Sequence, residues 1–166
     1  MITEGGVAVC QGKIMAVDVL PGLRQRFPQA EIVDHPGCAL TPALINAHIH
    51  LELSHLGELS DHPLQTNFTG WISRLLQLRE RLGATGDLAR QSAEQAAEQQ
   101  YRHGVSALAD IGNTGMGRDL AQTFPGYLLS FKEYLGLAEF TLEKNLQRLR
   151  REPEDTGQPG FGGRYR

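Results

Sequence analysis

The sequence predicts an α/β fold in which parallel strands alternate with helices. Runs with the character of buried strands occur at 38–47, 105–111 and 127–131. Segments with apolar residues at helical spacing lie between or after them, at 69–82, 88–102, 118–123 and 142–149. A short, strand-rich module precedes the first of these runs. This order of elements is typical of a parallel sheet, either open or closed into a barrel.

The first 37 residues predict a small β module that forms the first domain. Strands at 7–9 and 13–17 flank Gly12, which supplies the positive φ of a tight hairpin. Pro21 begins a single helical turn, and a third strand is expected at 31–33. These strands are short and carry few apolar residues, so they need partners from elsewhere.

The second predicted domain, 38–152, contains the alternating strands and helices. Its first run, 38–47, is almost continuously apolar, which predicts a strand buried on both faces. Thr69 is expected to cap the first long helix, and Asp87 the second. Six of the last fourteen residues, 153–166, are Gly or Pro, so this segment is predicted to be a flexible or non-native tail.

Composition excludes several classes of function. Of the 166 residues, 21% are charged, the net charge is -3, and no basic run exceeds Arg150–Arg151. Nucleic-acid binding needs a clustered basic face, so no nucleic-acid partner is expected. No apolar run approaches the ~20 residues of a membrane span, and the start of the chain lacks a signal peptide. Two cysteines, Cys10 and Cys38, are too few for a disulfide scaffold, which favours a reduced, cytoplasmic protein.

Two histidines mark the end of the first predicted strand. His48 and His50 are separated by one residue, and alternate side chains of a strand point to the same face. Imidazole binds zinc, iron and similar ions, and catalytic sites use about three protein ligands plus water. The carboxyl end of a parallel strand is also where α/β barrels place their active sites. Solvated or hydrogen-bonded histidines remain the alternative on spacing alone.

Three further polar residues are candidates for substrate binding. Glu52 follows His50 by two residues and is expected on the same face, as a substrate contact or as a hydrogen-bond partner of a ligand. A surface carboxylate is the alternative. Asp110 and Asn113 end the second strand on the same side of the sheet. They are candidates for a substrate pocket, with helix capping or turn formation as the alternative.

The segment 41–52, Thr-Pro-Ala-Leu-Ile-Asn-Ala-His-Ile-His-Leu-Glu, resembles the first-strand metal motif of the amidohydrolase superfamily. The branch that it resembles holds deaminases and chlorohydrolases, including cytosine, guanine and aminofutalosine deaminases and the triazine hydrolases. Four further segments resemble the sandwich, the first helix and the second strand of these enzymes: 12–17, 32–34, 68–72 and 103–110. The resemblance covers roughly residues 5–150.

The resemblance implies a TIM-type (β/α)8 barrel with a small β-sandwich assembled from both chain ends. His48 and His50 would be the first two ligands of a divalent metal, zinc or iron. Metal-bound hydroxide would then deaminate a small nitrogen heterocycle hydrolytically. The alternatives are hydrolysis of another C–N or C–Cl bond on the same scaffold, and a catalytically inert, truncated remnant.

The sequence also departs from that pattern. It reaches only the third barrel strand, and its last histidine, His103, precedes the second strand. The later ligands and the acid/base residues therefore have no counterpart. We expect a truncated or frame-shifted reading frame, or a portion of a longer hydrolase, that is inactive by itself. An incomplete barrel leaves an open sheet edge, so self-association is expected.

Overall fold

In a computed structural model of the protein, the described residues are 2–60, 67–134, 136 and 139–151. They form two compact units that divide between Pro42 and Ala43. The first unit contains β1 (Gly5–Cys10), β2 (Lys13–Val19) and α1 (Leu20–Arg26). The second contains, in order, β3 (Leu44–Ile49), η1 (Leu51–Leu53), η2 (Gly57–Leu59), α2 (Phe68–Leu82), α3 (Asp87–Arg102), β4 (Val105–Gly112), α4 (Met116–Leu120), β5 (Tyr127–Lys132) and α5 (Glu139–Arg151). The expected tail, 153–166, lies outside the described residues.

The first unit is built on an antiparallel hairpin. β1 pairs with β2, and the turn between them has positive φ at both Gln11 (50°) and Gly12 (74°). Such a turn matches the twist of the flanking strands, which confirms the predicted hairpin. Pro21 lies in the first turn of α1, where its missing N–H costs no hydrogen bond, and Leu23 is buried.

The predicted third strand at 31–33 is wrong. Residues 28–43 contain no strand, and the side chain of Val33 is 71% exposed. The β-branched pair Ile32–Val33 favours extended backbone, but a strand also needs a hydrogen-bonded neighbour. The only sheet described in this unit is the two-stranded one, and it does not include this segment.

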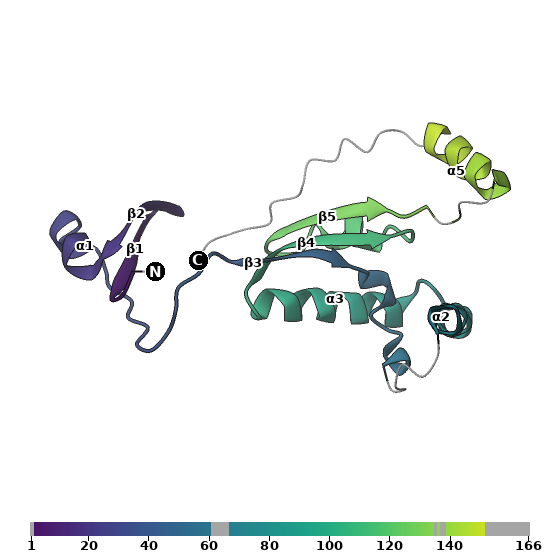
Figure 1. Ribbon diagram of the computed structural model, residues 1–166, viewed down its shortest axis with the longest axis horizontal. Helices are drawn as coiled ribbons and strands as arrows, with labels where there is room; N and C mark the ends of the chain where they lie inside the picture. Colours follow the sequence, from purple (N-terminus) through teal and green to yellow (C-terminus); the bar gives the residue numbers. More distant parts are fainter. Residues whose placement is uncertain (1, 61–66, 135, 137–138, 152–166) are drawn as a thin grey trace. The chain divides into compact units, whose positions relative to one another are not determined.

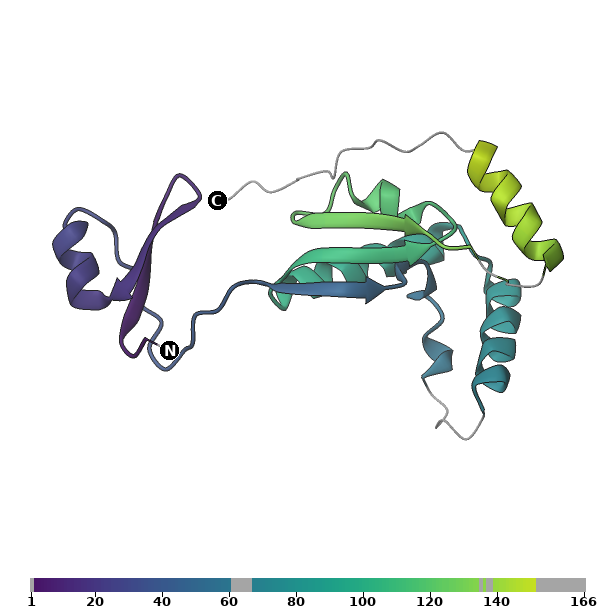
Figure 2. The same cartoon turned by 45° about the horizontal axis from the view of Figure 1, so that its top comes forward.

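The second unit is an open, mixed α/β arrangement with a three-stranded parallel sheet. The strand order is β3-β4-β5, and α3 and α4 lie in the crossovers (Figures 1 and 2). The predicted parallel order of the strands is therefore confirmed. No closed barrel is present among the described residues. The carboxyl ends of the three strands meet at one edge, as parallel pairing requires.

The first strand differs from its prediction in both bounds and burial. β3 begins at Leu44 instead of residue 38, and it lies at the edge of the sheet. The side chain of Ile45 is 72% exposed, so the strand is not buried on both faces. A run of apolar residues does not specify how many neighbouring layers cover the strand, which is why the sequence suggested more burial than the structure has.

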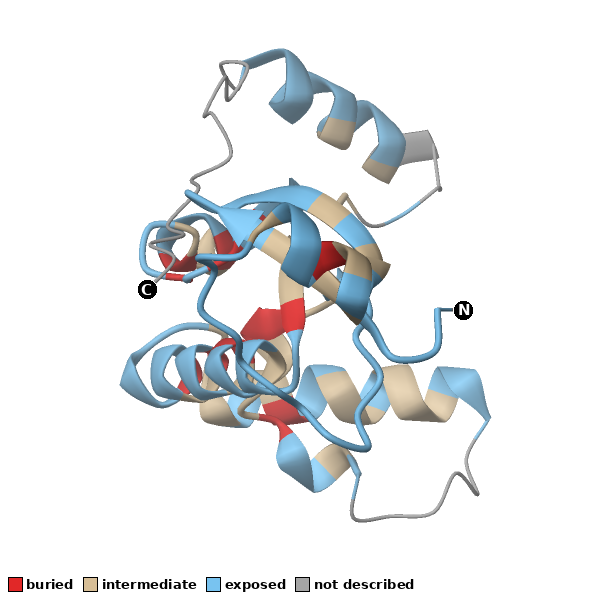
Figure 3. Ribbon diagram, turned by 90° about the vertical axis from the view of Figure 1, so that its left-hand side faces the viewer, coloured by how far each residue is buried: buried red, intermediate tan, exposed pale blue. Residues whose placement is uncertain are grey.

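The core of this unit lies between the sheet and the helices α3 and α4 (Figure 3). Leu51, Leu108 and Leu128 are almost completely buried there. α3 contributes small residues to the same cluster, Ala93 and Ala97, so its backbone approaches the sheet closely. The opposite face of β5 is different: Tyr127, Leu129 and Phe131 alternate with the buried Leu128 and are exposed.

The N-cap of helix α2 lies two residues before the predicted one. Asn67, and not Thr69, is the N-cap residue, and its Oδ1 accepts a hydrogen bond from the backbone N–H of Gly70 at 2.9 Å. Both residue types cap helices well, so the choice depends on where the chain enters the helix. Across the described residues, no helix has the length and apolar character needed to cross a membrane.

Candidate metal centre

His48 and His50 converge at the carboxyl end of β3. Their Nε2 atoms lie 3.1 Å apart, and the ring centroids are separated by 5.0 Å. The spacing of one residue places both rings on one side of the extended chain. Ile49, between them, packs instead against the core beneath the sheet. The two imidazoles therefore present their nitrogens to the same point.

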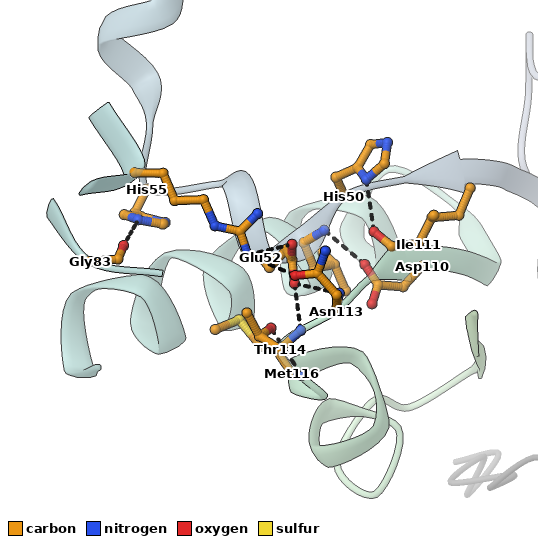
Figure 4. Close-up of polar contacts among 11 residues, drawn as sticks. His50, Glu52, His55, Gly83, Asp110, Ile111, Asn113, Thr114 and Met116 are labelled. Atoms are coloured by element: carbon orange, nitrogen blue, oxygen red, sulfur yellow. Dashed lines mark hydrogen bonds and ion pairs between the residues drawn. The ribbon is translucent and has the colours of Figure 1, made fainter. Parts of the chain in front are cut away.

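The ring of His50 is held by the neighbouring strand. Its Nδ1 lies 2.7 Å from the carbonyl oxygen of Ile111 in β4 (Figure 4). A carbonyl oxygen only accepts, so Nδ1 carries the hydrogen and donates it. In the neutral ring, Nε2 then keeps its lone pair and faces His48. Backbone carbonyls commonly orient metal-binding histidines in this way.

The pair fits two positions of a metal site. Nitrogens 3.1 Å apart, each about 2.05 Å from a cation, subtend an angle of about 98°. This value lies between the octahedral angle of about 90° and the tetrahedral angle of about 109°. The same distance also fits an Nε2–H···Nε2 hydrogen bond between neutral rings. No cluster of three or more His, Cys, Asp or Glu side chains suited to a metal occurs within the part of the chain that the structure describes.

Glu52 does not share the face of His50, because β3 ends at Ile49 and the chain turns into η1. Its side chain is only 4% exposed. Oε2 accepts hydrogen bonds from the backbone N–H groups of Asn113 and Thr114, both at 2.9 Å (Figure 4). Oε1 forms an ion pair with Arg79 of α2 at 3.0 Å. Glu52 thus links the end of β3 to α2 and to the loop that follows β4.

The surroundings of Glu52 lower the pKa of its carboxyl group. Burial acts to raise that pKa, but hydrogen bonds from Thr114 and Asn113 and the charge of Arg79 outweigh it. The pKa therefore lies below its ordinary value of 4.5. A lowered pKa means that the ionised carboxylate stabilises the folded state at pH values above the ordinary pKa. This contribution is lost as the pH falls through the lowered value.

The substitution Glu52→Gln tests this linkage. We expect the free energy of unfolding at pH 7 to fall by about 1–3 kcal/mol, because the glutamine N–H₂ group faces donors instead of accepting from them. The wild-type chain should lose stability as the pH falls below the ordinary carboxyl pKa of 4.5 and through the lowered pKa of Glu52, and the variant should lose less over the same range. Urea unfolding followed by circular dichroism at a series of pH values measures both effects. Glu58→Gln, at an exposed carboxylate, is the control; parallel pH profiles for Glu52→Gln and wild type would contradict the assignment.

Asp110 and Asn113 lie at the carboxyl end of β4, but their side chains have different surroundings. Asp110 is buried, and its Oδ1 accepts a hydrogen bond from the backbone N–H of Leu51 at 2.8 Å. Burial raises the pKa of the Asp110 carboxyl, and the charge of Glu52 adds to this, whereas Leu51 and His50 oppose it. Asn113 is exposed, and its Oδ1 accepts from Arg79 at 2.9 Å. Their predicted substrate contacts, like that of Glu52, stay predictions.

Sequence reasoning missed Arg79 and the position of His55. Arg79 of α2 bridges Glu52 and Asn113. His55 is half-buried; its Nε2–H donates to the carbonyl oxygen of Gly83 at 2.9 Å, and its buried Nδ1 has no hydrogen-bond partner among the residues that the structure describes. Neither contact has a signal in the sequence, because both join segments far apart along the chain.

Comparison with known proteins finds deaminases. No family model matches the chain. It is 29% identical over 112 residues to a 5-methylthioadenosine/S-adenosylhomocysteine deaminase of Nitratidesulfovibrio vulgaris (strain DP4), covering 67% of this chain and 24% of the relative. It is 27% identical over 143 residues to an adenosine deaminase of Helicobacter pylori, covering 86% and 33%. A third relative, a 5-methylthioadenosine/S-adenosylhomocysteine deaminase of Haloquadratum walsbyi, is 34% identical over 106 residues, covering 60% and 23%.

These similarities extend over most of this chain but only part of each relative. The matched region spans about a quarter to a third of the length of these curated relatives. The homologues of the chain are thus named as deaminases, at low identity and over part of their length.

Proposed function

We propose that this chain belongs to a metal-dependent hydrolase of the amidohydrolase superfamily, in which a (β/α)8 barrel is built on its parallel strands. The proposed reaction is hydrolytic deamination of an amine-bearing nitrogen heterocycle. The observation that carries the proposal is the convergence of the His48 and His50 Nε2 atoms, 3.1 Å apart, at the carboxyl end of a parallel strand. Similarity to deaminases, at 27–34% identity, supports the type of reaction.

In this proposal the residues at the carboxyl ends of β3 and β4 have defined roles. His48 and His50 bind a divalent cation, zinc or iron, through Nε2. The carbonyl oxygen of Ile111 orients His50, and the carboxylate of Asp110 holds the backbone of Leu51, directly after that ligand. A bound divalent cation supplies a nucleophile at neutral pH by lowering the pKa of water.

The names of the relatives suggest the class of substrate. Adenosine, 5-methylthioadenosine and S-adenosylhomocysteine all carry an exocyclic amine on a purine ring. A nucleoside-like substrate is therefore our first proposal for this chain. The same scaffold also supports hydrolysis of other C–N or C–Cl bonds, because a fold does not fix the substrate.

A catalytically inert remnant is the second candidate. It is favoured by one specific observation: the described residues hold two convergent histidines and no third ligand. Two imidazoles alone are fewer than the three protein ligands of a typical catalytic zinc site.

Reading the coding DNA beyond Arg166 in all three frames separates the two candidates. A complete barrel takes about 250 residues, so about 750 bases are sufficient. We expect a continuation with further histidines and a late Asp, and the protein that includes it should release ammonia from adenosine or 5-methylthioadenosine. Chelation of the metal and the substitution His50→Ala should each abolish that release. DNA without such a continuation, together with no ammonia release by the 166-residue chain, would establish the inert remnant.

A further inference from the structure

The loop after β4 is held by a sheltered ionic clamp. We define the Arg79–Glu52 clamp as these two side chains together with the backbone of 112–114. Nη2 of Arg79 lies 3.0 Å from Oε1 of Glu52 and donates to Oδ1 of Asn113 at 2.9 Å. The other carboxylate oxygen of Glu52 accepts from the N–H groups of Asn113 and Thr114. One guanidinium group thus fixes both the carboxylate and the loop that the carboxylate binds.

The clamp acts directly beside the group that orients His50. Ile111, whose carbonyl oxygen accepts from His50 Nδ1, is the residue before Gly112. An added Cβ at Gly112 would lie 2.8 Å from Oε2 of Glu52, so only glycine lets the carboxylate approach this closely. The carbonyl oxygen of Gly112 also accepts from the N–H of Glu133, the residue directly after β5. The backbone after Ile111 is therefore fixed from two sides.

Shelter from water makes this ion pair different from another on the same helix. The side chains of Arg79 and Glu52 are 22% and 4% exposed, whereas those of Arg81 and Glu58 are 58% and 52% exposed. Exposed pairs contribute little, and the loss of one partner from a sheltered pair leaves a charge uncompensated. Arg81 also reaches from α2 to η2, but its contacts within the described residues are with Glu58 and not with the loop after β4.

We propose that Arg79 is a positioning residue for His50. By holding Glu52 and Asn113, it keeps the Ile111 carbonyl oxygen where it accepts from Nδ1, and so keeps the lone pair of His50 on Nε2. The importance of this for catalysis rests on the proposed metal site, but the tautomer of His50 is a property of the metal-free chain. Arginine suits the task because its planar group directs N–H donors to two acceptors at fixed angles.

Nitrogen-15 NMR of the histidine side chains measures the tautomer directly. At about pH 8, where an ordinary imidazole is neutral, the metal-free wild-type chain should show His50 protonated on Nδ1 alone. In Arg79→Gln the two ring-nitrogen shifts should move toward each other as both tautomers become populated, and the zinc association constant should fall by about 10- to 100-fold. Arg79→Lys should lie between the two. His50→Gln assigns the signals.

Arg81→Gln is the matched control and should change neither the tautomer nor zinc binding. Urea unfolding of each variant checks that the variant is folded under the conditions of the NMR measurement. If Arg79→Gln does not fold, the His50 tautomer is measured in Arg79→Lys and Asn113→Ala instead. A folded Arg79 variant with His50 still protonated on Nδ1 alone would overturn the inference and leave the proposed function intact. A fixed wild-type tautomer that is lost in Arg79→Gln, with no zinc binding by the wild type, supports the positioning role and contradicts the metal site.

Discussion

The double substitution His48→Ala/His50→Ala is expected to remove saturable zinc binding from the 166-residue chain. The two Nε2 atoms are 3.1 Å apart, and the described residues offer no third His, Cys, Asp or Glu beside them. Substitution of a group that merely supports a ligand costs about 10- to 100-fold in affinity, so the loss of both ligands should cost at least about 100-fold. Competition with a chromophoric chelator measures the zinc affinity, and cobalt(II) absorbance reports the ligands.

Two other histidines provide the controls for this experiment. His103 caps the end of α3, where its Nδ1–H donates to the carbonyl oxygen of Gln99, and His35 lies in the first unit. His35→Ala and His103→Ala should bind zinc as the wild type does. Equal zinc affinity in the double variant and the wild type would show that the metal binds elsewhere, and would remove the observation on which the proposed function depends.

The helices and the inner strand, β4, of the second unit could be predicted from the sequence because their patterns are local. The apolar residues of α3 recur at helical spacing, and the strand predicted at 105–111 is only one residue shorter than β4. The extent and burial of the strand predicted at 38–47, and the existence of the one predicted at 31–33, depend instead on the segments that pack or pair beside them. An apolar run shows that a residue type suits burial, but only the partner layer decides whether it is buried.

The candidate site could be predicted only in part, for a similar reason. The spacing of His48 and His50 is a local property, and it led to the pair that converges in the structure. The position of Glu52 depends on the chain leaving the extended conformation after Ile49, which no periodicity revealed. The role of Arg79 depends on a contact between α2 and a loop more than thirty residues away, and a single sequence carries no signal for such a pairing.

The packing of α4 on β4 depends on a residue without a side chain. Gly117 is buried, and an added Cβ there would overlap with the Asp110 carboxylate and lie 3.0 Å from Oγ of Ser130. The Asp110 side chain cannot move away freely, because its Oδ1 accepts from the N–H of Leu51. Leu51 itself is completely buried in the core cluster. Contact between α4 and the sheet therefore requires glycine at this position.

Gly117→Ala is accordingly expected to lower the free energy of unfolding by about 3 kcal/mol or more. Overpacking a filled site costs about 1–3 kcal/mol, and a displaced Asp110 would leave the buried N–H of Leu51 unpaired at a cost of about 1–3 kcal/mol more. Urea unfolding followed by circular dichroism measures the change. Gly57→Ala is the matched control, because no described residue other than its chain neighbours has an atom within 4 Å of the added Cβ. If Gly117→Ala unfolded at the same urea concentration as Gly57→Ala, α4 would not pack this closely on Asp110, and the support that Asp110 gives to the backbone after His50 would need a different origin.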